Sequence, residues 1–150
     1  MSITGKILFS GPQESHWSKI IAWDQAYFSR PWMLKDWSEL DLKNHIILIW
    51  EKAGVPVGFA LYQTLSGDEA AHLYKIFLLS EFRGSSEAEC FFQESIKILK
   101  DKGFLRVYLE VEADNGRAIR FYEKMHFKHL RRVKAFYSDG VDALTMELTL

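Results

Sequence analysis

The spacing of apolar residues changes repeatedly between positions 71 and 125, and this pattern constrains the fold more than any other feature of the chain. Residues 71–79 and 105–111 have the composition of strands, and apolar side chains alternate along the second segment. After each of these segments, apolar residues recur every three or four positions, as in a helix that buries one side. These helical positions are Ala88, Phe91, Phe92, Ile96 and Leu99, followed by Ala118, Phe121, Tyr122 and Met125. The alternation predicts helices packed against a sheet.

The remaining segments extend this pattern into one domain. A helix is expected from Glu14 to just before Pro31, because the residue preceding a proline disfavours helical backbone angles. A short helix is expected from Met33 to Leu42. Further strands are expected at 6–10, 45–50, 57–65, 128–137 and 143–150, with turns at 53–56, 66–68 and 138–140. This order predicts a mixed α+β fold around one central sheet, and the length of 150 residues predicts a single domain over residues 1–150.

The composition excludes several classes of function. A formal net charge of −1 argues against direct nucleic-acid binding as the main task. Cys90 is the one cysteine, which rules out an intrachain disulfide and fits a reducing cytoplasm. The chain has no run of about 18 apolar residues, and its first residues lack the apolar core of a signal peptide. We therefore expect a cytoplasmic protein that is not embedded in a membrane. The histidines are scattered, so no metal site is predicted.

The loop over residues 82–88 leaves a strand and opens a helix. The start of a helix exposes unpaired N–H groups and a partial positive charge, which suit an anion such as a pyrophosphate. Taken alone, the segment Arg83–Ser86 is also explained as a turn that ends in a serine N-cap. Glu87 and Glu89 place two carboxylates in the first helical turn, where they would oppose a bound phosphate.

Several segments resemble the GNAT superfamily of N-acetyltransferases. Arg83-x-x-Ser86-x-Ala88 resembles its Gln/Arg-x-x-Gly-x-Gly/Ala loop for acetyl-CoA, with a serine where glycine is usual. Residues 109–115 resemble the Leu-Glu-Val-x-x-x-Asn run of the RimI-type enzymes, and residues 118–127 resemble their Ala-Ile-x-Leu-Tyr-Glu-x-Leu-Gly-Phe run. Pro31-Trp32 and the Asp-Gly-x-Asp-Ala ending also match the RimI branch, so the resemblance covers nearly the whole chain.

The resemblance implies a GNAT-like fold, in which a mixed, mostly antiparallel central sheet is flanked by about four helices. It implies acetyl-CoA as co-substrate and no metal. Glu110 matches the general base of the family, and Tyr122 matches the general acid that protonates the CoA sulfur. Trp32 and Tyr137 are expected to contact the acceptor. The residues expected to bind the cofactor are Ile76, Phe77, Leu78, Arg83, Gly84, Ser85, Ser86, Glu87, Ala88 and Asn115.

Some of these positions carry further expectations. The backbone of residues 76–78 is expected to pair with pantetheine where two neighbouring strands splay apart, and an amide there would polarise the acetyl carbonyl. Asn115 is expected both to bond pantetheine and to cap its helix. Lys75 replaces an asparagine that is usual in the family. His126 replaces a usual glycine, so the turn into the next strand is expected to be built differently.

Three functions remain open from the sequence. The leading hypothesis is transfer of an acetyl group from acetyl-CoA to a protein N-terminal α-amino group, by direct attack in a ternary complex, with a ribosomal protein as a candidate acceptor. The second keeps the chemistry but uses a small amine or a lysine side chain, since Trp32, Trp37 and Tyr137 would line a closed pocket as readily as a groove. The third is a non-catalytic module that binds acyl-CoA or another protein, suggested by the unusual loop at Ser86, Glu87 and Glu89.

Overall fold

The computed structural model describes residues 5–8, 14–64, 69–84 and 86–150 of the chain. Its elements are β1 (Gly5–Leu8), α1 (Glu14–Tyr27), α2 (Leu34–Ser38), β2 (His45–Lys52), β3 (Val55–Thr64), β4 (Ala70–Leu78), the 3-10 turn η1 (Ser80–Phe82), α3 (Ser86–Asp101), β5 (Arg106–Glu112), α4 (Gly116–Lys124), β6 (Lys128–Val133) and β7 (Ala143–Thr149). The order of helices and strands confirms the order predicted from the sequence. The turn expected at 66–68 lies outside the described residues, as do the last two positions of the first predicted strand.

Three elements are shorter than predicted. Helix α1 ends at Tyr27, before the expected limit next to Pro31. For the other two, an aspartate bonds the backbone of the chain that follows. Helix α2 ends at Ser38, and the Asp41 side chain then accepts a hydrogen bond from the Lys43 N–H at 2.9 Å, which forms a turn before β2. Strand β6 ends at Val133, and the Asp142 side chain accepts a hydrogen bond from the Ala135 N–H at 2.8 Å. The predictions of a helix to residue 42 and a strand to residue 137 were therefore too long.

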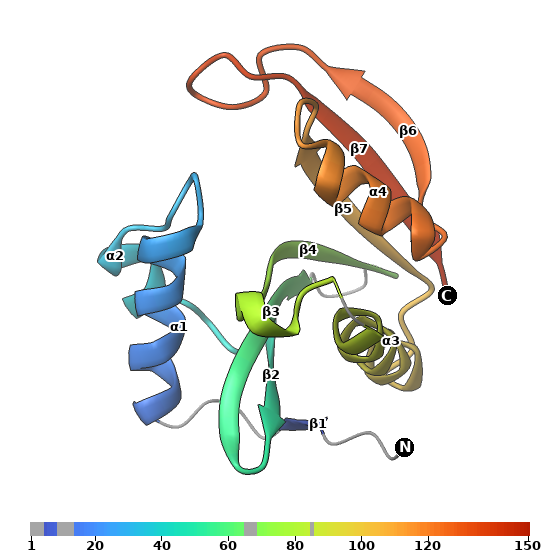
Figure 1. Cartoon of the computed structure of the whole chain (residues 1–150). Helices are drawn as coiled ribbons and strands as arrows, with labels where there is room; N and C mark the ends of the chain where they lie inside the picture. Colours follow the sequence, from blue (N-terminus) through green and yellow to red (C-terminus); the bar gives the residue numbers. More distant parts are fainter. Residues whose placement is uncertain (1–4, 9–13, 65–68, 85) are drawn as a thin grey trace.

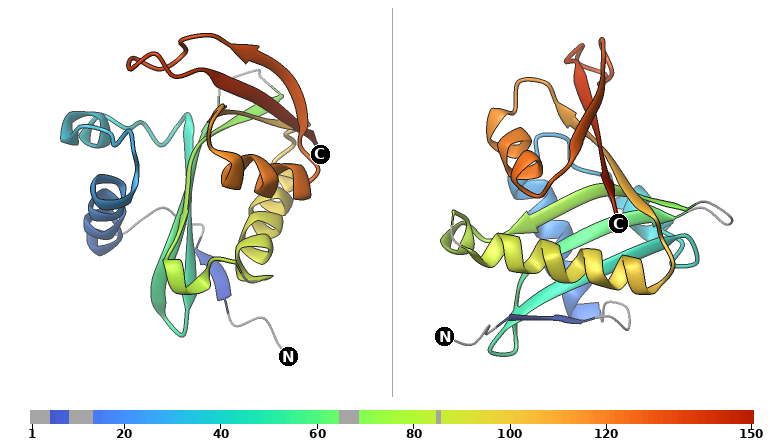
Figure 2. Two further views of the ribbon diagram at one scale, coloured as in Figure 1. Left: turned by 45° about the horizontal axis from the view of Figure 1, so that its top comes forward. Right: turned by 90° about the vertical axis from the view of Figure 1, so that its right-hand side faces the viewer.

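The strands form one seven-stranded sheet in the order β1-β2-β3-β4-β5-β7-β6. Strands β4 and β5 pair in parallel, while every other neighbouring pair is antiparallel. Helices α1 and α2 cover one face of the sheet, and α3 and α4 cover the other (Figures 1 and 2). The predicted mixed, mostly antiparallel sheet flanked by helices is confirmed. Among the helices that the structure describes, none is long and apolar enough to cross a membrane.

The central strands are buried on both faces, so the sheet divides the core in two. Alternation along β2 sends Ile47 and Ile49 into the core beneath α1 and α2, while Leu48 and Trp50 enter the core beneath α3 and α4. All four side chains are at most 4% exposed. This two-sided burial makes the middle of the sheet a rigid base for the strands that diverge beside it.

Strands β4 and β5 pair over only a short stretch and then separate. Their register joins residues 70–72 to residues 106–108, and beyond this point the two strands diverge (Figure 1). A β-bulge lies beside this fork, because Leu61 pairs with Lys75 while the next residue, Tyr62, pairs with Leu73. Tyr74 is the extra residue, and the strand changes faces there, so that Leu73 packs toward α3 whereas Phe77 packs toward α1. The predicted splay between neighbouring strands is confirmed.

The turn from α4 into β6 corrects one expectation. His126 has φ of 74°, so it adopts the left-handed conformation that glycine usually occupies. The His126 N–H bonds the Glu123 carbonyl at 3.0 Å, and the Phe127 N–H bonds the Tyr122 carbonyl at 3.0 Å. These two bonds form the Schellman end of a helix. The expectation of a differently built turn is therefore wrong, because histidine takes the strained conformation itself.

Candidate active site

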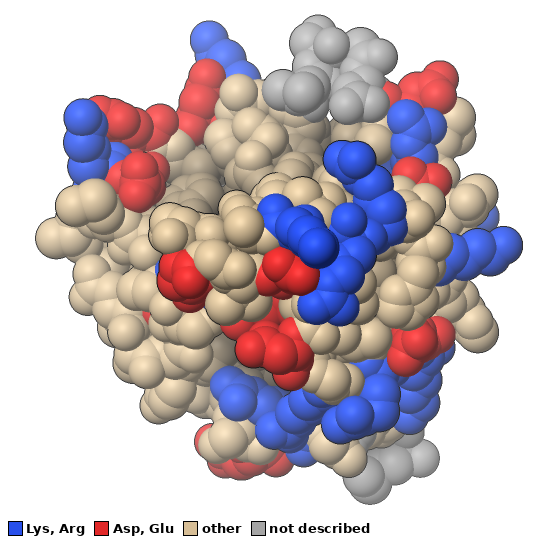
Figure 3. Space-filling model, turned by 90° about the horizontal axis from the view of Figure 1, so that it is seen from above, with Lys and Arg blue, Asp and Glu red and all other residues tan. Residues whose placement is uncertain are grey.

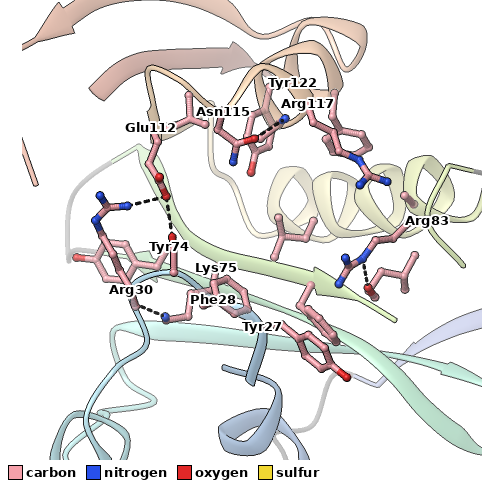
Figure 4. A pocket seen from close by; sticks show the side chains of 18 of the residues that line it. Tyr27, Phe28, Arg30, Tyr74, Lys75, Arg83, Glu112, Asn115, Arg117 and Tyr122 are labelled. Atoms are coloured by element: carbon pink, nitrogen blue, oxygen red, sulfur yellow. Dashed lines mark hydrogen bonds and ion pairs between the residues drawn. The ribbon is translucent and has the colours of Figure 1, made fainter. Parts of the chain in front are cut away.

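A cavity of about 790 Å³ lies at the fork between β4 and β5. The segment between α1 and α2, the start of α3, the start of α4 and the loop between β6 and β7 complete its walls (Figure 4). The predicted site residues that line it are Trp32, Ile76, Phe77, Leu78, Arg83, Gly84, Ala88, Glu110, Asn115, Tyr122 and Tyr137. The fold thus brings together side chains that the sequence places more than a hundred positions apart.

Three predicted cofactor residues are not among those that line the cavity. Ser85 lies outside the described residues, and Ser86 is exposed at the first position of α3. The Glu87 carboxylate accepts a hydrogen bond from Trp50 Nε1 at 2.6 Å and lies 3.3 Å from Lys52 Nζ. Glu87 is therefore directed toward β2 rather than into the cavity.

Trp37, the remaining aromatic residue considered for the acceptor site, belongs to the core instead. It is 4% exposed, and its Nε1 donates a hydrogen bond to Asp24 Oδ2 at 3.1 Å. Its indole also lies against the Trp32 ring, with centroids 4.7 Å apart. Trp37 thus supports a lining residue without lining the cavity itself.

Glu110 lies near the end of β5 and is bound by a histidine from β4. The two carboxylate oxygens of Glu110 lie 3.0 and 2.8 Å from His72 Nε2. The imidazole packs edge-on against the rings of Tyr74 and Tyr108, with centroids 4.5 and 5.1 Å away. His72 and Tyr108 are the last paired residues before the strands diverge. The carboxylate is therefore fixed at the point where the cavity opens.

Tyr122 projects from α4 into the same cavity, as Figure 4 shows. Burial raises the pKa of its hydroxyl above the ordinary value of 10, and the nearby Tyr137 adds to this shift. Tyr122 therefore retains its proton at neutral pH. At the start of α4, Asn115 Oδ1 accepts a hydrogen bond from the Ala118 N–H at 3.2 Å. This bond confirms the helix-capping part of the expectation for Asn115.

An ionic bridge closes the left side of the cavity in Figure 4, and the sequence analysis did not anticipate it. Arg30 Nη1 lies 2.7 Å from Glu112 Oε1, and Arg30 Nη2 lies 2.6 Å from Asp139 Oδ2. The guanidinium lies 4.0 Å from the centroid of the Tyr137 ring, and Ser29 Oγ donates to Glu112 at 2.9 Å. This Arg30 bridge joins the segment after α1, the end of β5 and the loop between β6 and β7. One sequence signal for this bridge was available. Residues two apart in a strand share a face, so Glu112 was expected to lie on the same side of the strand as Glu110.

A buried ion pair supports the same side of the cavity. Lys75 Nζ lies 2.5 Å from Asp24 Oδ1, and these side chains are 4% and 0% exposed. Asp24 also accepts hydrogen bonds from the Trp32 N–H at 2.8 Å and from the Trp37 indole. Lys75 Nζ reaches the Arg30 carbonyl at 3.4 Å. Burial lowers the pKa of Lys75, and the hydrogen bond to Asp24 opposes that shift. The lysine that replaces the usual asparagine therefore ties α1 and the segment after it to β4.

The opposite side of the cavity is basic. Arg83 and Arg117 both line it, and Figure 4 shows both on the side nearer α3. Arg83 Nε donates to the Leu78 carbonyl at 2.6 Å, which fixes the side chain against the end of β4. Gly84 has φ of 73°, a conformation that favours glycine in this turn. We call the part around Glu110, Glu112 and Arg30 the carboxylate end, and the part around Arg83 and Arg117 the arginine end.

Titratable side chains thus occupy both ends, but they do not form a metal centre. Among the described residues, no group of three or more His, Cys, Asp or Glu side chains is arranged to hold a metal ion. The cavity places the Glu110 carboxylate, a group able to accept a proton, and the protonated Tyr122 hydroxyl, a group able to donate one, within one space.

Comparison with known proteins agrees with this architecture. The model of the acetyltransferase (GNAT) family matches residues 14–127. A putative [ribosomal protein bS18]-alanine N-acetyltransferase of Bacillus subtilis is 31% identical, over 85% of each chain. An N-alpha-acetyltransferase of Saccharolobus solfataricus is 38% identical over half of this chain, and the match spans 46% of that protein.

The crystal structure of the ribosomal-protein-S18-alanine N-acetyltransferase from Escherichia coli shares the fold. The two structures superpose with a TM-score of 0.81, covering 96% of this chain and 94% of that one at 22% identity. The match to the family model covers the fork and every residue that lines the cavity except Tyr137. It confirms the predicted class of enzyme, an acetyl-CoA-dependent N-acetyltransferase. The chain belongs to the acetyltransferase (GNAT) family.

Proposed function

We propose that this protein acetylates the α-amino group of a protein N-terminus, by direct attack of the amine on acetyl-CoA in a ternary complex. The observation that carries the proposal is the placement of Glu110 and Tyr122 in one cavity at the fork of the sheet. The acceptor class is supported by the relatives, since the Bacillus subtilis protein is named for the N-acetylation of an alanine of a ribosomal protein. An N-terminus beginning with alanine, as in a ribosomal protein, is therefore the first acceptor to test.

Glu110 would act as the general base. An α-ammonium group has a pKa of about 7.7–8.0, so a carboxylate acting directly or through one water can remove its proton. The contact with His72 orients the Glu110 carboxylate in the cavity. The freed nitrogen then attacks the thioester carbonyl carbon, and Glu110 carries the proton that the amine has lost. Backbone N–H groups of residues 76–78 would stabilise the oxyanion, as the family resemblance implies.

Tyr122 would act as the general acid. As the tetrahedral intermediate collapses, the carbon–sulfur bond breaks and the sulfur takes the hydroxyl proton of Tyr122. The nitrogen loses its second proton as the amide forms, and this proton would return through water to the Tyr122 oxygen. The raised pKa of Tyr122 supports this role, because the group remains protonated until it is needed. Tyr122→Phe should lower kcat about a hundredfold with little change in the Kd for acetyl-CoA, since general acid catalysis typically contributes that much. Unchanged turnover in this variant would exclude Tyr122 as the acid.

A small primary amine is the second candidate acceptor. The observation that favours it is the Arg30 bridge, which closes one side of the cavity and leaves less room for a long peptide. The non-catalytic alternative has lost its main support. Its motivating feature was the unusual loop at Ser86, Glu87 and Glu89. Both carboxylates of this loop have partners, because Glu87 binds Trp50 and Lys52 while Glu89 pairs with Lys124.

Mass spectrometry of two peptides incubated with acetyl-CoA separates these candidates. One peptide has a free N-terminal alanine and no lysine, and the other has a blocked N-terminus and one lysine. A gain of one acetyl group on the first peptide alone is the expected result. Acetylation of the second peptide alone would move the assignment to lysine side chains. Modification of neither peptide, with CoA binding intact, would favour a small amine.

A further inference from the structure

One face of strands β5, β7 and β6 is not covered by any helix that the structure describes. Leu109 and Met146 point into the core beneath α3 and α4, so the residues that alternate with them point to the opposite face. Helices α1 and α2 pack on β2, β3 and β4 instead (Figures 1 and 2). Glu110 alternates with Leu109 and lies on this open face. An acceptor bound beside Glu110 can therefore contact side chains of the neighbouring strands.

One row of residues on this face runs from Glu110 to a basic side chain. Glu110 on β5 pairs with Thr145 on β7, and Thr145 pairs with Arg131 on β6. Paired residues of neighbouring strands share a face, so the Cα atoms of Glu110 and Arg131 lie about 10 Å apart, which is two strand spacings. The Thr145 hydroxyl is bound to the Arg131 backbone, accepting from its N–H and donating to its carbonyl, both at 3.2 Å. The residue between the two charges is therefore small and turned toward β6.

The Arg131 guanidinium keeps its charge at the surface. Arg131 is exposed, and within the described ranges no hydrogen bond or ion pair is found for its side chain. Burial raises the pKa of the Tyr108 hydroxyl, the Glu110 charge raises it further, and the Arg131 charge lowers it. Glu110 and Arg131 thus act on one hydroxyl from the same face of the sheet. This agrees with the row that the strand register gives.

Two other directions away from Glu110 are closed. The Arg30 bridge crosses the end of β5 at Glu112. Toward β4, the Glu110 carboxylate meets the His72 imidazole, which packs against the Tyr74 ring. A chain whose N-terminus lies at Glu110 therefore has an open path across β7 toward β6.

The far end of that path carries an excess of positive charge. Lys128 on β6 lies opposite Glu147 on β7, and Glu147 Oε2 lies 3.7 Å from Arg106 Nε. Lys128, Arg106 and Arg131 thus place three cations around one carboxylate. This balance attracts a single acidic side chain, whereas the glutamate among the cations disfavours the dense negative charge of a nucleic-acid backbone.

We propose that Arg131 binds an acidic side chain of the acceptor, in one of the residues that follow the acetylated N-terminus. An extended chain advances about 3.3 Å per residue, so a distance of about 10 Å from Glu110 corresponds to the third or fourth residue. Arginine suits this contact because its planar N–H groups bind both oxygens of a carboxylate. The inference rests on the proposed function, and it names the class of peptide that the enzyme prefers.

Peptides that differ in one charge test this inference. Each begins with alanine, ends in an amide, and carries glutamate, glutamine or lysine at the third or fourth position as its one variable residue. Wild type should acetylate the glutamate peptide with a kcat/KM about three- to tenfold above that of the glutamine peptide, the range for a partly exposed ionic contact. Arg131→Glu should reverse this order and prefer the lysine peptide. Each comparison is made between peptides on one protein, so a general loss of activity does not change the ratio.

Lys97→Glu is the matched control for the change in charge. Lys97 is exposed on α3, which covers the opposite face of the sheet. This variant should keep the preference of wild type for the glutamate peptide. The inference is overturned if wild type acetylates the three peptides equally well, or if Arg131→Glu still prefers glutamate.

Calorimetric titration of the same peptides into protein saturated with CoA separates this inference from the proposed function. CoA carries no acetyl group, so the titration measures peptide binding without turnover. Tighter binding of the glutamate peptide that Arg131→Glu abolishes, without acetylation of any peptide, would support the contact and count against the proposed function. Equal binding and equal acetylation of all three peptides would support the proposed function and overturn the contact.

Discussion

The two ends of the cavity carry opposite charges, and they also differ in whether their charged side chains already have partners in the protein. At the carboxylate end each acid already has a partner in the protein, since Glu110 contacts His72 while Glu112 and Asp139 share Arg30. At the arginine end, Arg117 has no such partner among the described residues. The first end is therefore organised before any ligand arrives, whereas Arg117 presents its charge to the cavity without an ionic partner in the described part of the chain.

This division suits a reaction between a cationic amine and an anionic cofactor. Carboxylates near the acceptor attract an ammonium group, and arginines at the other end attract phosphates. On the face seen from above, Lys and Arg are interspersed with Asp and Glu (Figure 3). A formal net charge of −1 agrees with this mixture. Under the proposed function, charge would therefore discriminate between the two substrates within the cavity rather than over the whole protein.

Glu110→Gln should have the largest effect, because it removes the base and leaves the rest of the carboxylate end in place. We expect kcat to fall by about a hundred- to ten-thousandfold, the usual contribution of a general base. Glu112→Gln is the matched control, since that side chain is already engaged by Arg30 and Ser29 and should change kcat by less than about tenfold. Single-turnover assays at saturating substrate measure both. Equal losses in the two variants would leave the base unassigned.

Lys75→Met tests whether the carboxylate end depends on the buried pair beneath it. The substitution leaves the Asp24 carboxylate buried without its cation, so the free energy of unfolding should fall by about 3–5 kcal/mol. Urea denaturation followed by tryptophan fluorescence measures this change. The double variant Lys75→Met/Asp24→Asn removes both charges and should recover most of the loss. A single variant as stable as wild type would show that the pair contributes little.

Arg30→Met breaks the bridge and should act on the acceptor alone. The segment after α1 and the loop between β6 and β7 lose their link, so KM for the peptide should rise about tenfold, as for one charge-assisted contact. The Kd for CoA should not change. Steady-state kinetics with each substrate varied in turn measures the effect on the peptide separately from the effect on the cofactor. The control is Lys35→Met, which changes an exposed lysine of α2. Equal weakening of both substrates would contradict a role confined to the carboxylate end.

The bridge should also persist in mild acid. The hydrogen bond from Arg30 lowers the pKa of the Asp139 carboxyl below its ordinary value of 3.8. A carboxyl with a lowered pKa in the folded state keeps its ionic contact above its ordinary pKa and loses it only as the pH falls through the lowered value. The ratio of the peptide KM of Arg30→Met to that of wild type should therefore stay constant from neutral pH down to about 4.5.

His126→Gly should have the smallest effect of these variants, and it should leave both the carboxylate end and the arginine end of the cavity unchanged. Glycine adopts the left-handed conformation of residue 126 without strain, so the free energy of unfolding should rise by about 1 kcal/mol. Urea denaturation measures this gain, and the kinetic constants for both substrates should match those of wild type. A loss of stability would mean that the contact between His129 and Glu123 beside this turn, or another contact of His126, outweighs the backbone strain.

Much of the fold followed from local patterns in the chain. Helices and strands were predictable because their apolar spacing reflects which face is buried, and this spacing is readable over a few residues. Glu110, Asn115 and Tyr122 could be named as candidates because they lie in short runs that resemble the family. The ends of α2 and β6 were missed because backbone bonds to Asp41 and Asp142 ended these elements, which apolar spacing does not report.

The sequence alone determined the order of elements, the family and the pair of residues suited to proton transfer. Only the tertiary structure decided how these residues are supported and where the charges lie. Asp24 and Lys75 are 51 positions apart, and Arg30 and Asp139 are 109 positions apart, so no local pattern links them. They meet because α1 packs on the sheet and because β4 and β5 diverge at the fork. Long-range ion pairs of this kind depend on packing, which brings distant charges within a few ångströms only once the core has formed.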